Sequence, residues 1–317
     1  MNSHHSMVGR SPNFESLMRS AYMVAATDVT VLITGETGTG KELLANELLQ
    51  LSPRVDKPFV ALNCAALPES IAESELFGHR KGAFTGAISH HKGLLQSAHG
   101  GTLFLDEVDS LTLALQAKLL RFLETGECQP VGEARTENVD VRIIAASNAS
   151  LDKKVDAREF RGDLYYRLNV VPLVIPPLRE RQSDIEDLIH HFLTKFATQH
   201  SAAKPNISNA ALGAMKSYNW PGNIRELKNL CERLSILLAG RTIERDNLPS
   251  EILHAGIRGT HPVINLPQAG LNLETLEVDL IHQALERTGG NRSKSARLLG
   301  MTRDTFLYRI QKYEIAG

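Results

Sequence analysis

The segment that most constrains the fold is an apolar, β-branched run that passes through a glycine-rich loop into a helical pattern. Residues 29–34 (VTVLIT) predict a buried strand, residues 35–41 (GETGTGK) follow it, and KELLANELLQL continues as a helix. Glycines let backbone N–H groups curl around phosphate oxygens, and the helix N-terminus adds positive potential. A plain glycine-rich turn is the alternative, but the strand–loop–helix context favours a P-loop. The residues assigned to it are Gly35, Glu36, Thr37, Gly38, Thr39, Gly40, Lys41 and Glu42, with Lys41 reaching the β- and γ-phosphates.

Two carboxylates follow another apolar run. Residues 102–105 (TLFL) predict a strand, and Asp106 and Glu107 stand directly after it. Solvated acids at a strand end are the alternative, but the P-loop upstream favours a functional pair. We expect Asp106 to hold Mg²⁺, directly or through water, and Glu107 to polarise the attacking water. Glu42 replaces the Ser or Thr that usually ligates Mg²⁺ in a P-loop, so metal coordination must rely on other groups.

Polar residues farther along the chain also fit phosphate chemistry. Ser147 and Asn148 end the next predicted strand, where an amide could orient water or the γ-phosphate. Arg161, Arg167 and Arg225 are candidates to stabilise transition-state charge, and an arginine supplied in trans raises the rate by about 10³–10⁵. Positions six apart on a helix differ by about 120°, so Arg161 and Arg167 are not expected to point the same way. A structural salt bridge is the alternative for each arginine.

Strands alternate with helical patterns over the first two thirds of the chain, which predicts an α/β domain with a parallel sheet covered on both faces. The expected strands are residues 29–34, 59–62, 102–105, 141–145 and 170–175. We expect the strands to stop at Pro176-Pro177 and helices to follow in 183–200, 208–217 and 223–239. The predicted division is an α/β subdomain at 1–176, a helical lid at 177–253, a Gly- and Pro-rich linker at 254–272 and an all-α domain at 273–317.

The last predicted domain carries the pattern of a helix-turn-helix. A helix at 274–288 ends at Gly289-Gly290, Asn291 is a candidate N-cap, and a second helix occupies 292–299. Gly300 suits the position after its end, and Thr302 suits the next N-cap. Short helices joined by a tight glycine turn are typical of helix-turn-helix modules.

The final helix presents a polar face, and its surroundings are basic. Between residues 287 and 312 there are seven basic side chains and a single acid. A solvated charged face is the alternative, but spacing, caps and charge together favour double-stranded DNA as a partner. The expected DNA contacts are Arg292, Thr302, Arg303, Thr305, Tyr308, Arg309 and Lys312.

The composition of the whole chain excludes several classes of protein. The formal net charge is -1, from 35 basic and 36 acidic residues, which excludes bulk polycation behaviour but permits a local basic patch. No apolar run approaches the roughly 18 residues of a membrane span, and the N-terminus lacks the pattern of a secretory signal. Three widely separated cysteines form no metal-type spacing and no disulfide framework. We therefore expect a cytoplasmic protein.

One hexapeptide makes the resemblance to a family specific. Residues 75–87 read ELFGHRKGAFTGA, and the chain also contains GGTLFLDE, FRGDLYYRL and WPGNIRELKN. From about residue 7 to 253 the chain resembles the AAA+ domain of bacterial sigma-54-dependent activators, in which the hexapeptide tips a loop that touches sigma-54. The C-terminal segment is similar to the Fis-type helix-turn-helix, which ordinarily works as a dimer. The implied sigma-54 contacts are Gly82, Ala83, Phe84, Thr85, Gly86 and Ala87, with Phe84 and Thr85 as the central pair.

The loop can also be interpreted without the family. Residues 78–92 contain three glycines, few apolar residues and no strong period, so they belong at the surface. The loop contains one Phe, Phe84, and no Tyr or Trp. An exposed Phe at the tip indicates a contact point, and a Phe folded back onto its own domain is the alternative.

The resemblance implies roles for further residues. Asn63 resembles the residue that links Glu107 to the state of the γ-phosphate. The other implied roles fall to Asn148 (sensor I), Arg161 and Arg167 (arginine fingers reaching the neighbouring subunit's ATP), Arg225 (sensor II), and Val8 and Gly9 (adenine pocket). Arg80 stands where the family pattern has an acidic residue, and Ser147 stands where Thr is commoner.

The resemblance also implies a mechanism. We expect a homo-oligomeric ring, a hexamer, in which ATP hydrolysis moves the GAFTGA loop and remodels sigma-54 RNA polymerase to the open complex. The helix-turn-helix would tether the ring to upstream DNA and raise its effective concentration. Because the AAA+ pattern starts within ten residues of Met1, we expect either control in trans, by a separate protein or by expression, or a chain that is a fragment. The alternatives are a general AAA+ remodeller and a sigma-70-type regulator with a decayed AAA+ domain; the intact hexapeptide argues against both.

Overall fold

The computed structural model describes residues 7–84, 86–253, 272–313 and 315. The chain divides into two compact units, Met1–Ile257 and Arg258–Gly317, which we describe separately. The linker expected at 254–272 falls almost wholly outside the described residues. In the described part of the chain, no helix is both long and apolar enough to cross a membrane.

A five-stranded parallel sheet forms the centre of the first unit, in the order β2-β3-β6-β1-β7. Each strand is a short apolar run, because a strand covered on both faces has no solvent side to accommodate polar residues. All five strands expected from the sequence are present, with ends shifted by one or two residues. Their bounds are β1 Val31–Thr34, β2 Phe59–Asn63, β3 Thr102–Asp106, β6 Arg142–Ser147 and β7 Val171–Val174.

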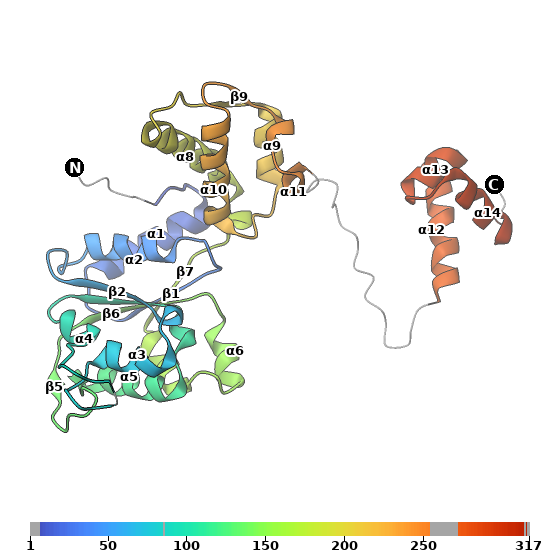
Figure 1. Ribbon diagram of the computed structural model, residues 1–317. Helices are drawn as coiled ribbons and strands as arrows, with labels where there is room; N and C mark the ends of the chain where they lie inside the picture. Colours follow the sequence, from blue (N-terminus) through green and yellow to red (C-terminus); the bar gives the residue numbers. More distant parts are fainter. Residues whose placement is uncertain (1–6, 85, 254–271, 314, 316–317) are drawn as a thin grey trace. The chain divides into compact units, whose positions relative to one another are not determined.

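Helices cover both faces of this sheet (Figure 1). Alternate strand residues enter different cores: Leu103 and Leu105 pack with α3, α5 and α7, whereas Phe104 packs with α1 and α2. This alternation is the two-residue period of a strand. The predicted α/β fold is therefore confirmed. The covering helices are α1 Pro12–Ala25, α2 Lys41–Gln50, α3 Glu69–Phe77, α4 Leu94–Ser97, α5 Leu113–Thr125, α6 Leu151–Asp156 and α7 Gly162–Leu168, with 3-10 turns Cys64–Ala66 and Val108–Ser110.

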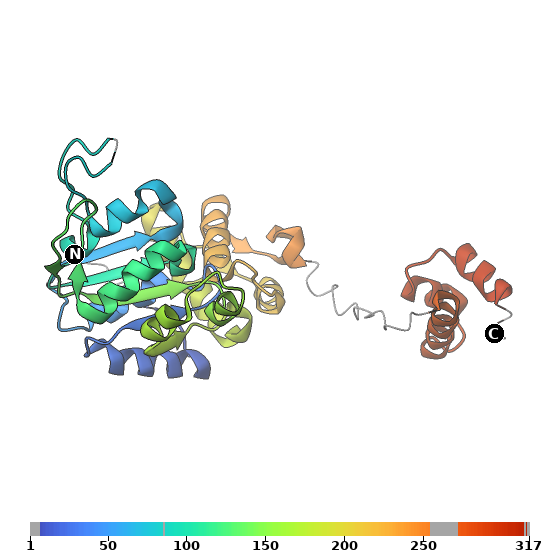
Figure 2. The same cartoon turned by 90° about the horizontal axis from the view of Figure 1, so that it is seen from below.

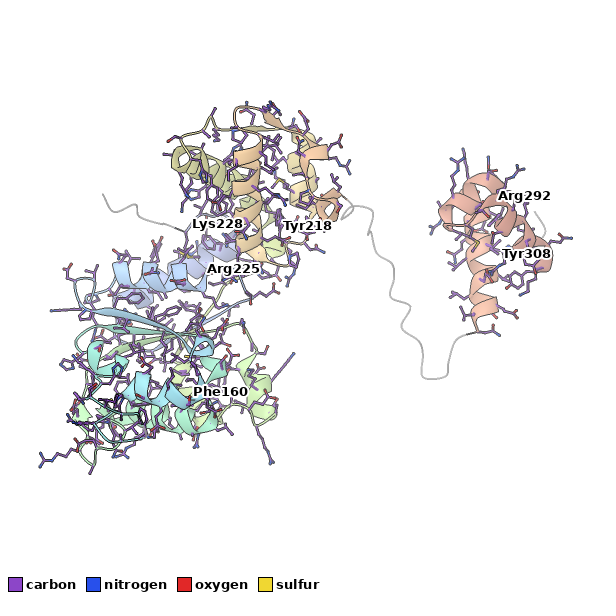
Figure 3. All side chains as sticks on the ribbon, viewed as in Figure 1. Phe160, Tyr218, Arg225, Lys228, Arg292 and Tyr308 are labelled. Atoms are coloured by element: carbon purple, nitrogen blue, oxygen red, sulfur yellow. The ribbon has the colours of Figure 1, made fainter. Side chains whose placement is uncertain are left out.

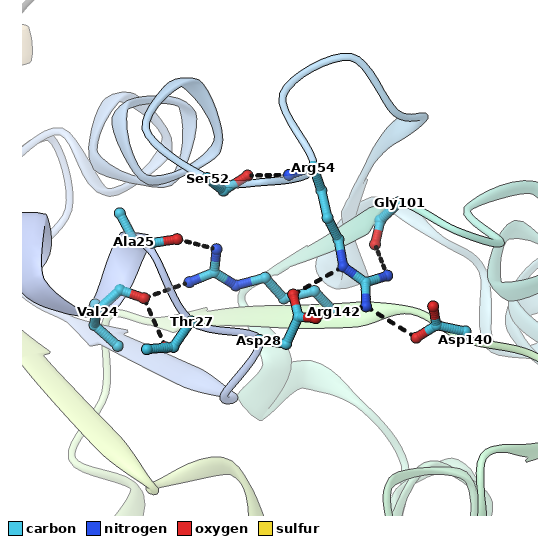
Figure 4. A network of polar contacts seen from close by, with 9 residues as sticks. All are labelled: Val24, Ala25, Thr27, Asp28, Ser52, Arg54, Gly101, Asp140 and Arg142. Atoms are coloured by element: carbon cyan, nitrogen blue, oxygen red, sulfur yellow. Dashed lines mark hydrogen bonds and ion pairs between the residues drawn. The ribbon is translucent and has the colours of Figure 1, made fainter.

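A polar network fastens α1 to the sheet (Figure 4). Arg142, which is fully buried, donates from Nη1 to the Ala25 carbonyl at 2.9 Å and from Nη2 to the Val24 carbonyl at 3.0 Å. Nearby, Arg54 donates from Nε to Asp28 at 2.8 Å and from Nη2 to Asp140 at 2.9 Å. The two bonds from Arg142 satisfy carbonyls that the end of α1 leaves without helical partners.

The lid follows β7 and has its own apolar core around Trp220. The Trp220 indole donates to the Met215 carbonyl at 2.8 Å, so the buried ring has its one donor satisfied. Three of the lid helices match the expected positions within about two residues. The lid elements are α8 Ile185–Gln199, α9 Asn209–Ser217, α10 Asn223–Leu237 and α11 Ser250–Leu253, with 3-10 turns Leu178–Glu180, Gln182–Asp184 and Arg245–Asn247.

The expectation that strands stop at Pro176-Pro177 is wrong. β8 Asn206–Ile207 pairs in parallel with β9 Thr242–Ile243 inside the lid. A further antiparallel pair, β4 Glu127–Cys128 and β5 Glu137–Asn138, follows α5. Two-residue strands show no two-residue period in sequence, so such pairs leave no pattern to detect.

In the described residues of the second unit, 272–313 and 315, there are three helices, α12 Leu273–Arg287, α13 Arg292–Leu298 and α14 Arg303–Lys312. Both expected N-caps are confirmed: Asn291 Oδ1 accepts from the Lys294 N–H at 3.1 Å, and Thr302 Oγ1 accepts from the Thr305 N–H at 3.2 Å. Gly300 adopts φ +68°, a left-handed conformation that suits a glycine after a helix end. Phe306 lies fully buried at the centre of this unit's core.

Candidate functional site: a cavity beneath the lid, a projecting loop and a helix-turn-helix

A cavity of about 590 Å³ lies where the P-loop, the end of β3 and the lid helices α8 and α10 meet. Figure 3 labels Arg225 and Lys228, the two basic residues of α10 that border it. The sequence-predicted residues that line it are Val8, Thr37, Gly38, Gly40, Lys41, Glu42, Asp106, Glu107 and Arg225. Residues more than two hundred positions apart in sequence thus share one site.

The P-loop has the backbone expected of a phosphate cradle. Gly38 adopts φ +81°, and a Cβ built there would lie 2.3 Å from the Gly222 carbonyl oxygen, so only glycine fits. The Lys41 ammonium donates to the Gly35 carbonyl at 2.9 Å and to the Glu36 carbonyl at 3.3 Å. Burial lowers the pKa of Lys41, while the carboxylates of Asp106 and its neighbour act in the opposite direction. The ammonium therefore lies among the backbone groups that would hold phosphate.

Both carboxylates at the end of β3 border the cavity with Lys41. Glu107 is held at φ +53°, an uncommon conformation for a residue with a side chain, and such backbone strain clusters at functional sites. Asp106 Oδ1 accepts from the Glu107 N–H at 3.0 Å. Asn63 on β2 is the register partner of Asp106, and its Oδ1 accepts from the Ala65 N–H at 2.9 Å. Asn63 is thus beside the carboxylate pair without lining the cavity itself.

The end of β6 touches the P-loop directly. Asn148 Nδ2 donates to Thr37 Oγ1 at 3.3 Å. Ser147 is fully buried and donates from Oγ to Asp109 Oδ1 at 2.7 Å, while Lys154 pairs with the same carboxylate at 2.9 Å. Ser147 makes this bond through its hydroxyl, a group that the Thr commoner at this position also has.

Sequence reasoning missed the residues that join the P-loop to the lid. Arg179 donates from Nη2 to Glu36 Oε1 at 2.7 Å and from Nη1 to Oε2 at 2.9 Å. Asn223 Nδ2 donates to Glu36 Oε2 and to the Thr37 carbonyl, both at 3.1 Å. The hydrogen bond from Arg179, followed by that from Asn223, lowers the pKa of Glu36. The only sequence signal was the position of Asn223 in WPGN at the start of a helix.

The two predicted arginine fingers do not line the cavity of their own chain. Arg161 precedes α7 and pairs with Asp163 at 2.7 Å. Arg167, in the last turn of α7, donates to the Leu123 carbonyl from Nη2 at 2.8 Å and from Nε at 3.1 Å. Arg161 therefore has the salt bridge that was the alternative for a single arginine, whereas Arg167 is held by a backbone carbonyl.

The loop that carries the hexapeptide projects from the α/β subdomain (Figure 2). His79 and His91 form a bridge at its base, and the Gly82 N–H donates to the Ala87 carbonyl at 2.9 Å. Phe84 is 42% exposed, and its ring meets the His79 ring edge-on at 5.0 Å. Phe84 is therefore only partly folded back onto its own loop. Thr85 lies outside the described residues.

A second loop braces the hexapeptide loop. Arg80 Nε donates to Glu133 Oε2 at 2.7 Å, and the Arg80 N–H donates to the Val131 carbonyl at 3.0 Å. A Cβ built at Gly132 would lie 2.7 Å from the Ala83 Cβ, so the two loops are in close contact. The basic residue that departs from the family pattern thus has an acidic partner in this chain.

On the predicted DNA-contact face of α14, some residues are exposed and others form ion pairs within the unit. Arg303, Thr305 and Tyr308 are exposed, as is Arg292 on α13 (Figure 3). Arg309 instead pairs with Glu277 of α12, and the Lys312 ammonium lies 3.1 Å from Glu274 of the same helix. Two of the basic groups on this face therefore already have carboxylate partners within the unit.

Comparisons with known proteins agree with this arrangement. Residues 7–174 match the sigma-54 interaction domain, residues 179–262 match an AAA+ ATPase lid domain, and residues 272–313 match the bacterial regulatory proteins of the Fis family. The transcriptional regulatory protein ZraR of Salmonella typhi is 46% identical over 96% of this chain and 68% of its own length. The Nif-specific regulatory protein of Enterobacter agglomerans is 47% identical over 98% of this chain and 60% of its own length.

A solved structure extends the comparison to the fold. NtrX from Brucella abortus in complex with ATP has a TM-score of 0.72 and 33% identity, covering 97% of this chain and 69% of that one. The likeness covers nearly the whole of this chain and supports the AAA+ fold. The chain belongs to the sigma-54-dependent transcriptional activators, with an AAA+ ATP-binding domain, its lid and a Fis-type DNA-binding domain.

Proposed function

We propose that this activator hydrolyses ATP and uses the energy to move the GAFTGA loop against sigma-54 RNA polymerase, which opens the promoter complex. The observation that carries the proposal is the cavity that brings Lys41, Asp106 and Glu107 together beneath the lid. In the same α/β subdomain, a loop with the family's contact motif projects from the sheet (Figure 2). The P-loop and the carboxylates of the proposed nucleotide site therefore belong to the same α/β subdomain as the proposed sigma-54 contact.

The chemistry assigned to the cavity follows from its residues. Lys41 and the P-loop N–H groups bind the phosphates, and Glu107 takes the proton of the attacking water. Asn63, beside Asp106 in the sheet register, carries the state of the γ-phosphate to the carboxylate pair.

Magnesium fits the donor set at this site. Mg²⁺ is usually held by one or two carboxylates together with substrate phosphates and water, and Asp106 supplies such a carboxylate at the cavity wall. When bound, the ion would neutralise phosphate charge. Glu42 also borders the cavity, but it is exposed and stands in place of the usual hydroxyl ligand.

Arg161, at the start of α7, and Arg167, in its last turn, are proposed to complete the site only between subunits. Because neither Arg161 nor Arg167 lines the cavity of its own chain, we propose that they reach the γ-phosphate of a neighbouring copy in a hexameric ring. The pair between Arg161 and Asp163 is exposed to solvent, which weakens it, so Arg161 can exchange Asp163 for such a contact.

The helix-turn-helix binds upstream DNA and holds the ring near the promoter. Exposed Arg292, Arg303 and Tyr308 support this role. A two-fold dimer of the module would read half-sites about 34–36 Å apart, or a multiple of that distance.

The test is co-elution of the purified protein with sigma-54 in ADP and a metal-fluoride phosphate mimic. We expect a complex that forms only with the mimic and disappears in Thr85→Ala. Ile88→Ala, an exposed residue just outside the hexapeptide, is the matched control and should bind normally. No complex despite active ATP hydrolysis would assign the ring to another partner, as in a general AAA+ remodeller.

A further inference from the structure

A buried ion pair at the start of the lid has no role in the function described so far. Arg181 is 1% exposed and Asp184 is fully buried, and Arg181 Nε donates to Asp184 Oδ2 at 2.8 Å. Arg181 also lines the nucleotide cavity. A buried pair of this kind is weak evidence for stability, because the cost of removing two charges from water offsets much of their attraction. Because the pair lies next to the cavity and contributes little to stability, we infer that it has a positioning role.

The carboxylate of this pair holds the N-terminal segment. Asp184 Oδ1 accepts from the Arg10 N–H at 2.8 Å and from the Ser11 N–H at 2.7 Å, and Oδ2 accepts from Ser11 Oγ at 2.7 Å. Burial raises the pKa of Asp184, but the hydrogen bonds from Arg10, Ser11 and Arg181 outweigh it, so the net shift is downward. The group is thus an anion that gathers donors from residues more than 170 positions away in sequence.

The guanidinium of Arg181 holds Val8, which precedes Arg10 and Ser11 in the chain. Arg181 Nη2 donates to the Val8 carbonyl at 2.9 Å, and its Cζ lies 3.8 Å from the centroid of the Phe14 ring. A Cβ built at Gly9 would lie 2.4 Å from Arg181 Nη2, 2.6 Å from Phe14 Cδ1 and 2.8 Å from Asp184 Oδ2. The side chains that would have to give way are packed or ion-paired, so the backbone at Gly9 rests directly against the pair.

Of residues 8–11, Val8 is the one that borders the cavity, and Arg181 holds its carbonyl, so the pair fixes this part of the cavity wall. Backbone N–H and C=O groups can select a base only when they are fixed in position. Adenine offers a donor at its 6-amino group and an acceptor at N1, whereas guanine reverses both. A wall of fixed polarity therefore favours one purine, and a loose wall accepts either.

We propose that the Arg181–Asp184 pair is a positioning device that fixes residues 8–11 and thereby sets the preference for adenine over guanine. The inference rests on the proposed ATP binding and adds the residues that impose base selectivity. Phosphate binding belongs to the P-loop, so the pair should govern which base is accepted while the phosphates are held as before.

The test compares the affinities of the purified protein for N-methylanthraniloyl-ATP and N-methylanthraniloyl-GTP. In Asp184→Asn and Arg181→Met we expect ATP affinity to fall by about 10-fold and GTP affinity to stay close to wild type. The KM for ATP should rise by a similar factor while kcat at saturating ATP stays within about twofold. A purely structural defect would lower both affinities and kcat together.

The matched control is Arg142→Met. Arg142 is equally buried and donates to two backbone carbonyls at the end of α1 (Figure 4), but it does not line the cavity. This variant should keep the wild-type ratio of ATP to GTP affinity even if its melting temperature falls. A changed ratio in Arg142→Met would mean that general loosening causes the effect, which overturns the inference.

A second variant leaves both charges in place. Gly9→Ala displaces the wall by steric contact alone and should also reduce the ratio of ATP to GTP affinity. An unchanged ratio in Gly9→Ala, or in folded Asp184→Asn, overturns the inference. Failure of the wild-type protein to bind ATP at all would instead overturn the proposed function.

Discussion

Replacing Phe306 by alanine should unfold the helix-turn-helix and leave the nucleotide-binding unit intact. Phe306 is fully buried at the centre of a core formed by α12, α13 and α14, where it packs with Ile281, Leu285 and Ile310. Truncating a buried Phe to Ala costs about 3–5 kcal/mol, because apolar contacts are lost and a cavity remains.

That cost is large for so small a unit. At roughly 0.05–0.15 kcal/mol per residue, three helices spanning 273–312 have about 2–6 kcal/mol of total stability. The substitution therefore removes most or all of it. Because the chain divides into two compact units, the loss should not spread to Met1–Ile257.

Calorimetry and fluorescence anisotropy check this prediction. Phe306→Ala should lose the calorimetric transition of the second unit and its binding to a labelled DNA duplex, with ATP hydrolysis unchanged. Leu298→Ala, which truncates an exposed residue of α13, should keep both. Loss of ATP hydrolysis, or DNA binding at wild-type affinity, would refute the reasoning that the unit is small and independent.

Three further predictions concern the first unit. Lys41→Ala should abolish nucleotide binding without lowering the melting temperature, since the ammonium contacts only P-loop carbonyls; an isothermal titration that still shows tight ATP binding contradicts this. Gly38→Ala should weaken nucleotide binding and lower the free energy of unfolding by about 1–2 kcal/mol, because a residue in the left-handed conformation gains a Cβ 2.3 Å from the Gly222 oxygen. Melting curves equal to those of the wild type would show that this clash does not occur. The hydrogen bond from Arg54 lowers the pKa of Asp28. This partly exposed ion pair therefore stabilises the fold by about 0.5 kcal/mol above pH 4. The stabilisation is lost as the pH falls through the pKa that Asp28 has in the folded protein. Asp28→Asn should therefore lower the melting temperature at pH 7, and denaturation at acid pH should show the difference disappearing.

Local signals made much of the fold predictable. Each central strand is an apolar run long enough to show its type, and Asn291 and Thr302 cap helices through bonds to residues three positions away. The P-loop and the carboxylates after β3 were predictable for the same reason, since each follows a recognisable strand.

The rest depends on contacts between distant segments. Glu36 meets Arg179 and Asn223 across more than 140 positions, which no local pattern encodes. Arg181 and Asp184 occur in a charged stretch, RERQSD, that looks like a solvated surface and is nonetheless buried at these two positions. Similarly, helix spacing indicated the polar face of α14 but not the α12 carboxylates that pair with its last two basic groups.

The close contact between the P-loop and the first turn of α10 has a mechanical consequence. The Arg225 N–H donates to the Gly38 carbonyl at 3.2 Å, so the base of this helix is attached to the loop that would sense phosphate. α10 is 15 residues long, which corresponds to about 22 Å. A tilt of about 10° at its base displaces its far end by about 4 Å, from simple lever geometry on that length. A small change in the direction of α10 at the P-loop thus becomes a displacement of several ångströms at its far end.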